Sequence, residues 1–209
     1  MALLRQAIIA FGRMNPPTSA HIKLINLVGS HAKDFNADPY VFLSKKVDNK
    51  RNPLSPERRL YWLSKIMELP SFVKESPIEI NSFIDCLKYF SGKYNNLTVL
   101  CGSDRMLEYG RIMHDYNGVE FNYYSTHLIS IGKRSDDNIS SSVVRKTITD
   151  IDFLSFKEFY PMLNDDDCSE MFSELTCSMD INKPDVRTRG LNGNQENIKK
   201  EEGRISSNN

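Results

Sequence analysis

The segment up to residue 25 constrains the fold of this chain more than any other part of it. The apolar run of residues 7–11 predicts a buried strand, and Gly12 followed by Pro16-Pro17 predicts a tight turn. Thr18 or Ser19 can then cap a helix. That helix has an apolar inward stripe at Ile22, Leu24, Ile25 and Val28. A strand that turns directly into a helix is the opening unit of an α/β fold.

The start of this helix is a predicted anion site. The first turn of a helix has free N–H groups and a partial positive charge, which attract phosphate. His21 precedes Leu24 and Ile25 by one turn, so it lies on the inward stripe close to that site. The alternative is a core histidine behind an ordinary Pro-Pro-Thr helix start. The combination with a preceding strand favours phosphate handling.

A second segment far along the chain has the same chemistry. Residues 136–138 predict a turn, and a serine of the triplet at 140–142 can cap a helix from Val143 to about Ile148. Arg145 in the first turn of this helix would add the coplanar N–H donors of its guanidinium group, which suit phosphate. The alternative is a capped surface helix with a solvated arginine.

Helix and strand signals alternate along the rest of the chain, as a parallel sheet requires. Further strands are predicted at residues 40–43, 78–80, 97–101, 121–124 and 128–131. Helices are predicted over residues 55–67, around residues 83–90, and from about 105 to 114. We expect a doubly wound, mostly parallel, Rossmann-like α/β sheet. Ligands of such sheets lie beyond the carboxyl ends of the strands, where four turns should converge: residues 12–21, 45–51, 102–105 and 140–145.

These residues resemble a known family. Residues 12–21, which contain Gly-x-x-Asn-Pro-Pro-Thr, resemble the [T/H]-x-G-H motif of the nucleotidyltransferase superfamily of the cytidylyltransferase and adenylyltransferase type. Residues 139–145 resemble its second signature, I-S-S-T-x-x-R, and the resemblance covers roughly residues 5–150. The Asn-Pro-Pro-Thr version is most similar to nicotinamide-nucleotide and phosphopantetheine adenylyltransferases. A phage-encoded member is one interpretation.

The sequence departs from the family pattern at three positions. Ala20 stands where the family has Gly, which adds a methyl group where backbone approaches ligand closely. Ser142 replaces the usual Thr and keeps the hydroxyl, and Thr18 is a known variant of the first His. Ala20 bears most directly on catalysis, because its methyl would narrow the pocket.

The resemblance implies a nucleotidyl transfer from ATP or CTP to a small phosphorylated acceptor, with Mg²⁺ carried on the triphosphate. It assigns catalytic roles to Thr18, His21 and Arg145. It assigns nucleotide binding to Gly12, Arg13, Asn15, Asp104, Ser140, Ser141 and Ser142. It assigns acceptor binding to Lys45, Lys46 and Arg59. From the residues alone, Asp104 can equally cap a helix, and the lysines can be solvated loop charges.

Composition argues against several other classes of protein. The 209 residues have 27 basic and 27 acidic side chains, so nothing indicates a protein that coats nucleic acid. The four cysteines lack metal-site spacing, and no apolar run or signal peptide indicates a membrane. We expect a cytoplasmic protein, in the host cytoplasm if the gene belongs to a phage.

Composition also divides the chain into a domain over residues 1–163 and a polar tail over residues 164–209. The tail begins with Asp165-Asp166-Asp167, interpreted as a solvated acidic run, and becomes rich in Asn, Gly, Lys and Glu. Low apolar content cannot offset the entropy of ordering, so we expect a tail that is disordered or is ordered by a partner, either a second copy in a homo-oligomer or another protein. Two other classes stay open: a weakly active or inactive nucleotide-binding module, and a structural component of a larger assembly such as a virion.

Overall fold

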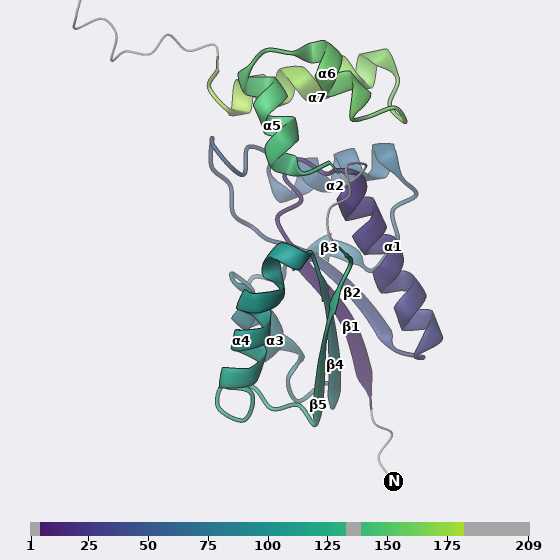
Figure 1. Ribbon diagram of the computed structural model, residues 1–209, viewed down its shortest axis with the longest axis vertical. Coiled ribbons are helices and arrows are strands. Elements are labelled where there is room, and N and C mark those ends of the chain that lie inside the picture. The colour runs from purple at the N-terminus through teal and green to yellow at the C-terminus, as the bar shows by residue number, and fades with distance from the viewer. Residues whose placement is uncertain (1–4, 133–138, 182–209) are drawn as a thin grey trace, which may run out of the picture.

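The first strand of the chain lies at the centre of the sheet (Figure 1). The computed structural model describes residues 5–132 and 139–181, which contain a five-stranded sheet in the order β3-β2-β1-β4-β5 with every pair parallel. The strands are β1 (Gln6–Gly12), β2 (Asp38–Leu43), β3 (Val73–Glu75), β4 (Asn96–Cys101) and β5 (Ser125–Ser130). The chain order reverses between β1 and β4, which is the topological switch point. The predicted doubly wound α/β fold is confirmed.

The two faces of the sheet have separate hydrophobic cores. The described helices are α1 (Ser19–Asp34), α2 (Pro56–Ile66), α3 (Phe83–Phe90), α4 (Met106–Tyr116), α5 (Ser141–Thr149), α6 (Phe153–Glu158) and α7 (Asp165–Ser178). Along β1, Ala7 and Ile9 belong to a core with residues of α3 and α4, whereas Ile8 and Ala10 belong to a core with residues of α1, α2 and α5–α7. Successive side chains of a strand point to opposite faces, so a continuous apolar run is what a doubly covered parallel strand needs.

The predicted helix caps are confirmed, although α5 begins at Ser141, two residues before the predicted Val143. Thr18 is the N-cap of α1, and the Ser55 and Ser140 hydroxyls accept backbone N–H bonds at the starts of α2 and α5. These caps are local interactions within three residues, so they can be predicted from a short stretch of sequence. The turn predicted at residues 136–138 lies outside the described residues.

Two strand predictions are wrong. Residues 78–80 form a turn in which Ile78 is 84% exposed, and the edge strand is β3 instead. Residues 121–124 do not extend the sheet, because the Asn117 side chain bonds both the N–H and the C=O of Tyr123 in place of a neighbouring strand. The last strand also begins earlier than predicted, at Ser125.

The expected domain boundary at residue 163 is wrong as well. Residues 165–178 form α7, in which Cys168, Met171 and Leu175 are fully buried in the core of the second face. The composition of the whole segment is polar, but its few apolar residues recur at positions 168, 171 and 175, which share one face of a helix. The core therefore includes residues beyond position 163, and the structure describes the chain as far as residue 181.

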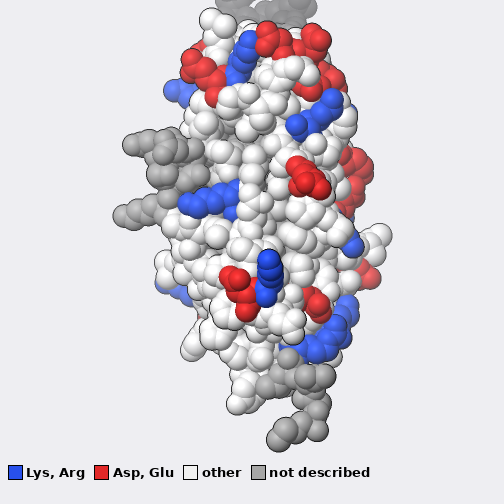
Figure 2. Space-filling view, turned by 90° about the vertical axis from the view of Figure 1, so that its right-hand side faces the viewer, with Lys and Arg blue, Asp and Glu red and all other residues white. Residues whose placement is uncertain are grey.

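The three aspartates expected to be a solvated run begin α7. The Asn164 side chain caps the helix at the N–H of Asp167, and acidic residues in a first turn are stabilised by the helix dipole. Asp165 and Asp167 also form ion pairs with Lys157 and Lys65. Figure 2 shows acidic side chains gathered at this end of the molecule, with basic side chains beside them.

The described residues contain no disulfide: Cys86, Cys101 and Cys168 are buried free thiols and Cys177 is an exposed one. Within the same residues, every helix is too short or too polar to cross a membrane.

Candidate active site

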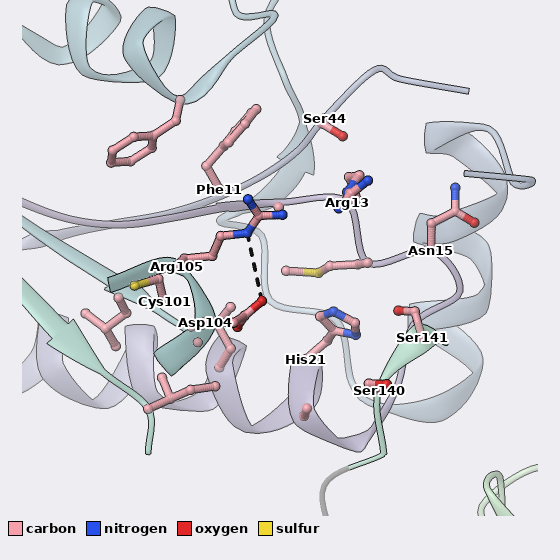
Figure 3. Close-up of a pocket in the computed structure, with 18 of the residues that line it drawn as sticks. Phe11, Arg13, Asn15, His21, Ser44, Cys101, Asp104, Arg105, Ser140 and Ser141 are labelled. Carbon is pink, nitrogen blue, oxygen red and sulfur yellow. Dashed lines mark ion pairs between the residues drawn. The ribbon is translucent and has the colours of Figure 1, made fainter. Parts of the chain in front are cut away.

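A cavity of about 500 Å³ opens at the carboxyl ends of β1 and β4, beside the switch point (Figure 3). All four of the turns expected to converge at this edge line the cavity: the turn after β1 with the start of α1, the end of β2, the turn after β4, and the start of α5. Segments more than a hundred residues apart in sequence are therefore brought to one space.

The turn after β1 supplies one wall of the cavity. Gly12, Arg13 and Asn15 line it, together with Met14, which has a positive φ of 46°. The Asn15 side chain is fully buried and pairs with both the N–H and the C=O of Leu54. The Asn15 amide thus ties the turn to the segment before α2, and the residue lies in the cavity lining, where its role in nucleotide binding stays a prediction.

His21 lies in the first turn of α1 and faces the cavity (Figure 3). Its Nδ1 accepts a hydrogen bond from the backbone N–H of Thr18 at 3.0 Å and lies 2.9 Å from the Thr18 hydroxyl. A backbone N–H can only donate, so Nδ1 must lack a proton and the neutral ring has its proton on Nε2. His21 is thus set as a donor through Nε2, the role that an anion in the cavity requires.

The start of α5 faces the start of α1 across the cavity. Ser140, Ser141 and Ser142 line it together with Arg145. The Ser141 hydroxyl donates to the carbonyl of Pro16, and Arg145 donates to the carbonyl of Asn15 and the hydroxyl of Ser142. The two sequence motifs therefore contact one another directly.

The cavity lining is mainly basic. Its cationic side chains are Arg13, Lys23, Lys46, Arg105 and Arg145, against the two carboxylates of Asp104 and Glu108. Burial lowers the pKa of Arg145, and the nearby charges of Arg13 and Arg51 lower it further. A bound anion would relieve this repulsion, so the electrostatics favour a phosphate-bearing ligand.

Asp104 and Arg105 extend this lining at the turn after β4. Asp104 lies in a short 3₁₀ turn before α4, and no side-chain cap bond is made at the start of either element. Arg105 pairs with Glu108 at 2.6 Å, which raises the pKa of the guanidinium, and lies 3.9 Å from Asp104. Asp104 therefore lies in the cavity wall, as expected, and the alternative of a helix cap is not observed.

Three of the expected site residues do not line the cavity. Arg59 is fully buried and donates to the backbone carbonyls of Arg13, Ser44 and Ser55, and burial lowers its pKa to about 10. Lys45 donates to the carbonyls of Pro77 and Ile78. Thr18 is buried behind His21. Arg59 and Lys45 thus hold backbone segments together, and of the three residues expected to bind the acceptor only Lys46 faces the cavity.

Sequence reasoning missed several cavity residues. Among them are Lys23, Arg105, Glu108 and the stacked pair of Phe83 and Tyr109, whose ring centroids are 3.6 Å apart. Lys23 could have been found, because it follows His21 by two residues at the same helix start. The aromatic pair joins two helices that are distant in sequence and has no local signal.

The described residues contain no group of three or more His, Cys, Asp or Glu side chains that could hold a metal ion. Asp104 and Glu108 are the carboxylates nearest the cavity, and Arg105 contacts both of them.

A doubly wound parallel sheet with a basic cavity at its switch point defines a Rossmann-like α/β protein. A family model described as cytidylyltransferase-like matches residues 9–147, which is more than half of the 209 residues. The chain therefore belongs to the cytidylyltransferase-like family, and this membership supports nucleotidyl transfer as the general reaction. No curated protein matches the sequence. The matched range contains both motifs and ends before α6 and α7.

Proposed function

We propose that this protein transfers a nucleoside monophosphate, AMP or CMP, from a nucleoside triphosphate to a small phosphorylated acceptor and releases pyrophosphate. The observation that carries the proposal is the geometry of His21. Its Nδ1 accepts from the Thr18 N–H, so the ring has its proton on Nε2, at the N-terminus of α1 and in a cavity with mainly basic walls. The finer likeness of the turn to nicotinamide-nucleotide and phosphopantetheine adenylyltransferases supports AMP transfer.

The reaction needs no protein nucleophile. An oxygen of the acceptor phosphate forms a bond to the α-phosphorus, and the bond from that phosphorus to the α–β bridging oxygen breaks. The electron pair of the broken bond leaves with pyrophosphate. His21 stabilises negative charge that develops on the α-phosphate and the bridging oxygen, so catalysis rests on positioning and on fixed donors.

The other residues of the cavity lining bind the remaining parts of the two substrates. In this proposal the start of α5, with the three serines and Arg145, binds the β- and γ-phosphates, and Asp104 contacts the nucleoside. Lys46 contacts the acceptor, next to Ser44, whose buried hydroxyl makes no hydrogen bond within the described residues. Mg²⁺ enters on the triphosphate and supplies charge neutralisation.

Two measurements test the proposal. A thermal-shift screen with ATP, CTP, GTP and UTP, each with and without Mg²⁺, should raise the melting temperature for the nucleotide that binds. Pyrophosphate release should then appear with that nucleotide and a phosphorylated acceptor. Nucleotide binding without release across a panel of acceptors would favour a binding module instead. An absence of any nucleotide binding would favour a structural component.

Arg145→Ala should weaken triphosphate binding about 10- to 100-fold, the range expected for a lost hydrogen bond to a charged group. Binding of the nucleoside monophosphate should change much less, because the guanidinium is assigned to the distal phosphates. Calorimetric titration with both ligands checks this. Equal losses for the two ligands would remove Arg145 from the distal phosphates and leave it as the residue that holds the carbonyl of Asn15.

Ala20→Gly tests the departure from the family motif. Ala20 lines the cavity in the first turn of α1, so removal of its methyl should keep or raise the rate of pyrophosphate release. The folded state should lose up to about 1 kcal/mol, because glycine is unfavourable inside a helix. Steady-state kinetics and thermal unfolding measure the two effects. A fall in activity would show that the methyl packs against the substrate and does not obstruct it.

A further inference from the structure

The turn between β1 and α1 is held in place by side chains of three other segments. Each contact is a side-chain donor on a backbone carbonyl: Arg59 on Arg13, Arg145 on Asn15, Ser141 on Pro16, and Tyr160 on Pro17. The prolines at positions 16 and 17 have no N–H, so these carbonyls are the main points at which the turn can be fixed. The first three donors come from α2 and α5. The fourth comes from the turn between α6 and α7.

Tyr160 and the candidate catalytic histidine bond the two ends of one peptide group, the one between Pro17 and Thr18. The Tyr160 hydroxyl donates to the carbonyl of Pro17 at 2.7 Å. The N–H of the same peptide group belongs to Thr18 and donates to Nδ1 of His21 at 3.0 Å. A peptide group is planar and rigid, so a partner that fixes its carbonyl also fixes the direction of its N–H. Hydrogen bonds at both ends of a peptide group also polarise one another.

The segment that supplies Tyr160 is well anchored. Tyr160 is 1% exposed, and its ring lies 5.0 Å from that of Phe156. The helix α7, which follows this segment, is tied to α2, because Glu174 accepts hydrogen bonds from Trp62 and Arg58. Tyr160 lies beyond residues 9–147, the range that the cytidylyltransferase-like family model matches. A segment outside the matched range thus contacts the first motif.

We propose that Tyr160 is a positioning residue for His21, which it orients through the Pro17–Thr18 peptide group. By holding that peptide, the Tyr160 hydroxyl holds Nδ1 of His21 as an acceptor and Nε2 as the donor that faces the substrate. The kinetic part of this proposal rests on the proposed nucleotidyl transfer. The structural part does not, and it has its own readout.

Tyr160→Phe removes only the hydroxyl and keeps the ring. Tyr123→Phe is the matched control, because Tyr123 is also a buried tyrosine whose hydroxyl donates to a backbone carbonyl, that of Leu87 in the other core. Both variants should lower the melting temperature by a similar amount. Only Tyr160→Phe should lower kcat, by about 10-fold, a scale typical of small misplacements of a catalytic group. Its KM for the triphosphate should change less than about twofold.

The double variant decides whether the effect passes through His21. In a His21→Ala background, Tyr160→Phe should lower kcat less than about twofold further, because the group that it orients is gone. Full additivity of the two losses would overturn the proposal. Equal losses of kcat in Tyr160→Phe and Tyr123→Phe would also overturn it, since both would then reflect general destabilisation.

A spectroscopic readout holds even if the protein releases no pyrophosphate. The chain has four histidines, and ¹⁵N spectra of their rings can be assigned with His21→Ala. The wild-type ring of His21 should show a protonated Nε2 and an unprotonated Nδ1. Tyr160→Phe should shift these signals towards a mixture of the two tautomers, whereas Tyr123→Phe should leave them unchanged. Unaltered His21 signals in Tyr160→Phe would refute the positioning role, independently of whether the proposed function stands.

Discussion

His21→Ala should lower the rate of nucleotidyl transfer about 10²- to 10³-fold, the scale of losing one donor to transition-state charge. The ring lines the cavity at the N-terminus of α1, and its Nδ1 bond to Thr18 leaves Nε2–H as the donor. The affinity for the triphosphate should change much less, because the other phosphate contacts remain. Single-turnover kinetics with radiolabelled triphosphate, together with equilibrium binding, separates the two quantities.

His114→Ala is the matched control for this variant. His114 lies on the outer surface of α4 with its side chain 89% exposed, away from the cavity lining, so its loss should leave the rate unchanged. A His21→Ala protein that turns over at the wild-type rate would remove His21 from the chemistry. Loss of triphosphate binding equal to the loss of rate would make His21 a ground-state contact.

A chain that ends at Leu163 should lose cooperative folding, or melt about 15 °C or more below the full chain. Removal of α7 deletes the fully buried side chains of Cys168, Met171 and Leu175 and exposes the core that they cover. Each large-to-small change in a core costs about 2–5 kcal/mol, against a total stability of about 5–15 kcal/mol for a domain. Differential scanning calorimetry measures the loss.

A chain that ends at Ile181 is the control for this truncation. It retains every buried residue that the structure describes, so it should melt close to the full chain. The substitution Met171→Ala tests the same packing more mildly, with an expected loss of about 2–5 kcal/mol in the free energy of unfolding. A cooperative transition at the full-chain temperature in the chain that ends at Leu163 would show that α7 contributes nothing to the core.

Local signals predicted the motif-bearing elements well. The apolar run of β1, the proline pair and the threonine cap all act within a few residues, so strand, turn and helix start could be predicted in register. The edge strand β3 could not, because only Val73 of its three residues is buried, and the pairing with β2 selects it. The helix α7 was hidden by its polar composition, although its apolar spacing was present.

The sequence alone determined which segments bear the chemistry. It placed His21 and Arg145 at helix starts and the turns of the motifs at strand ends, because caps, turns and hydrophobic periodicity depend on near neighbours. The tertiary structure alone decided what each polar side chain contacts. Arg59 was expected at the acceptor and instead bonds backbone carbonyls, and Tyr160 bonds a carbonyl 143 residues away. Long polar side chains take the partners that folding brings to them, and a buried carbonyl needs a donor wherever in the sequence that donor lies.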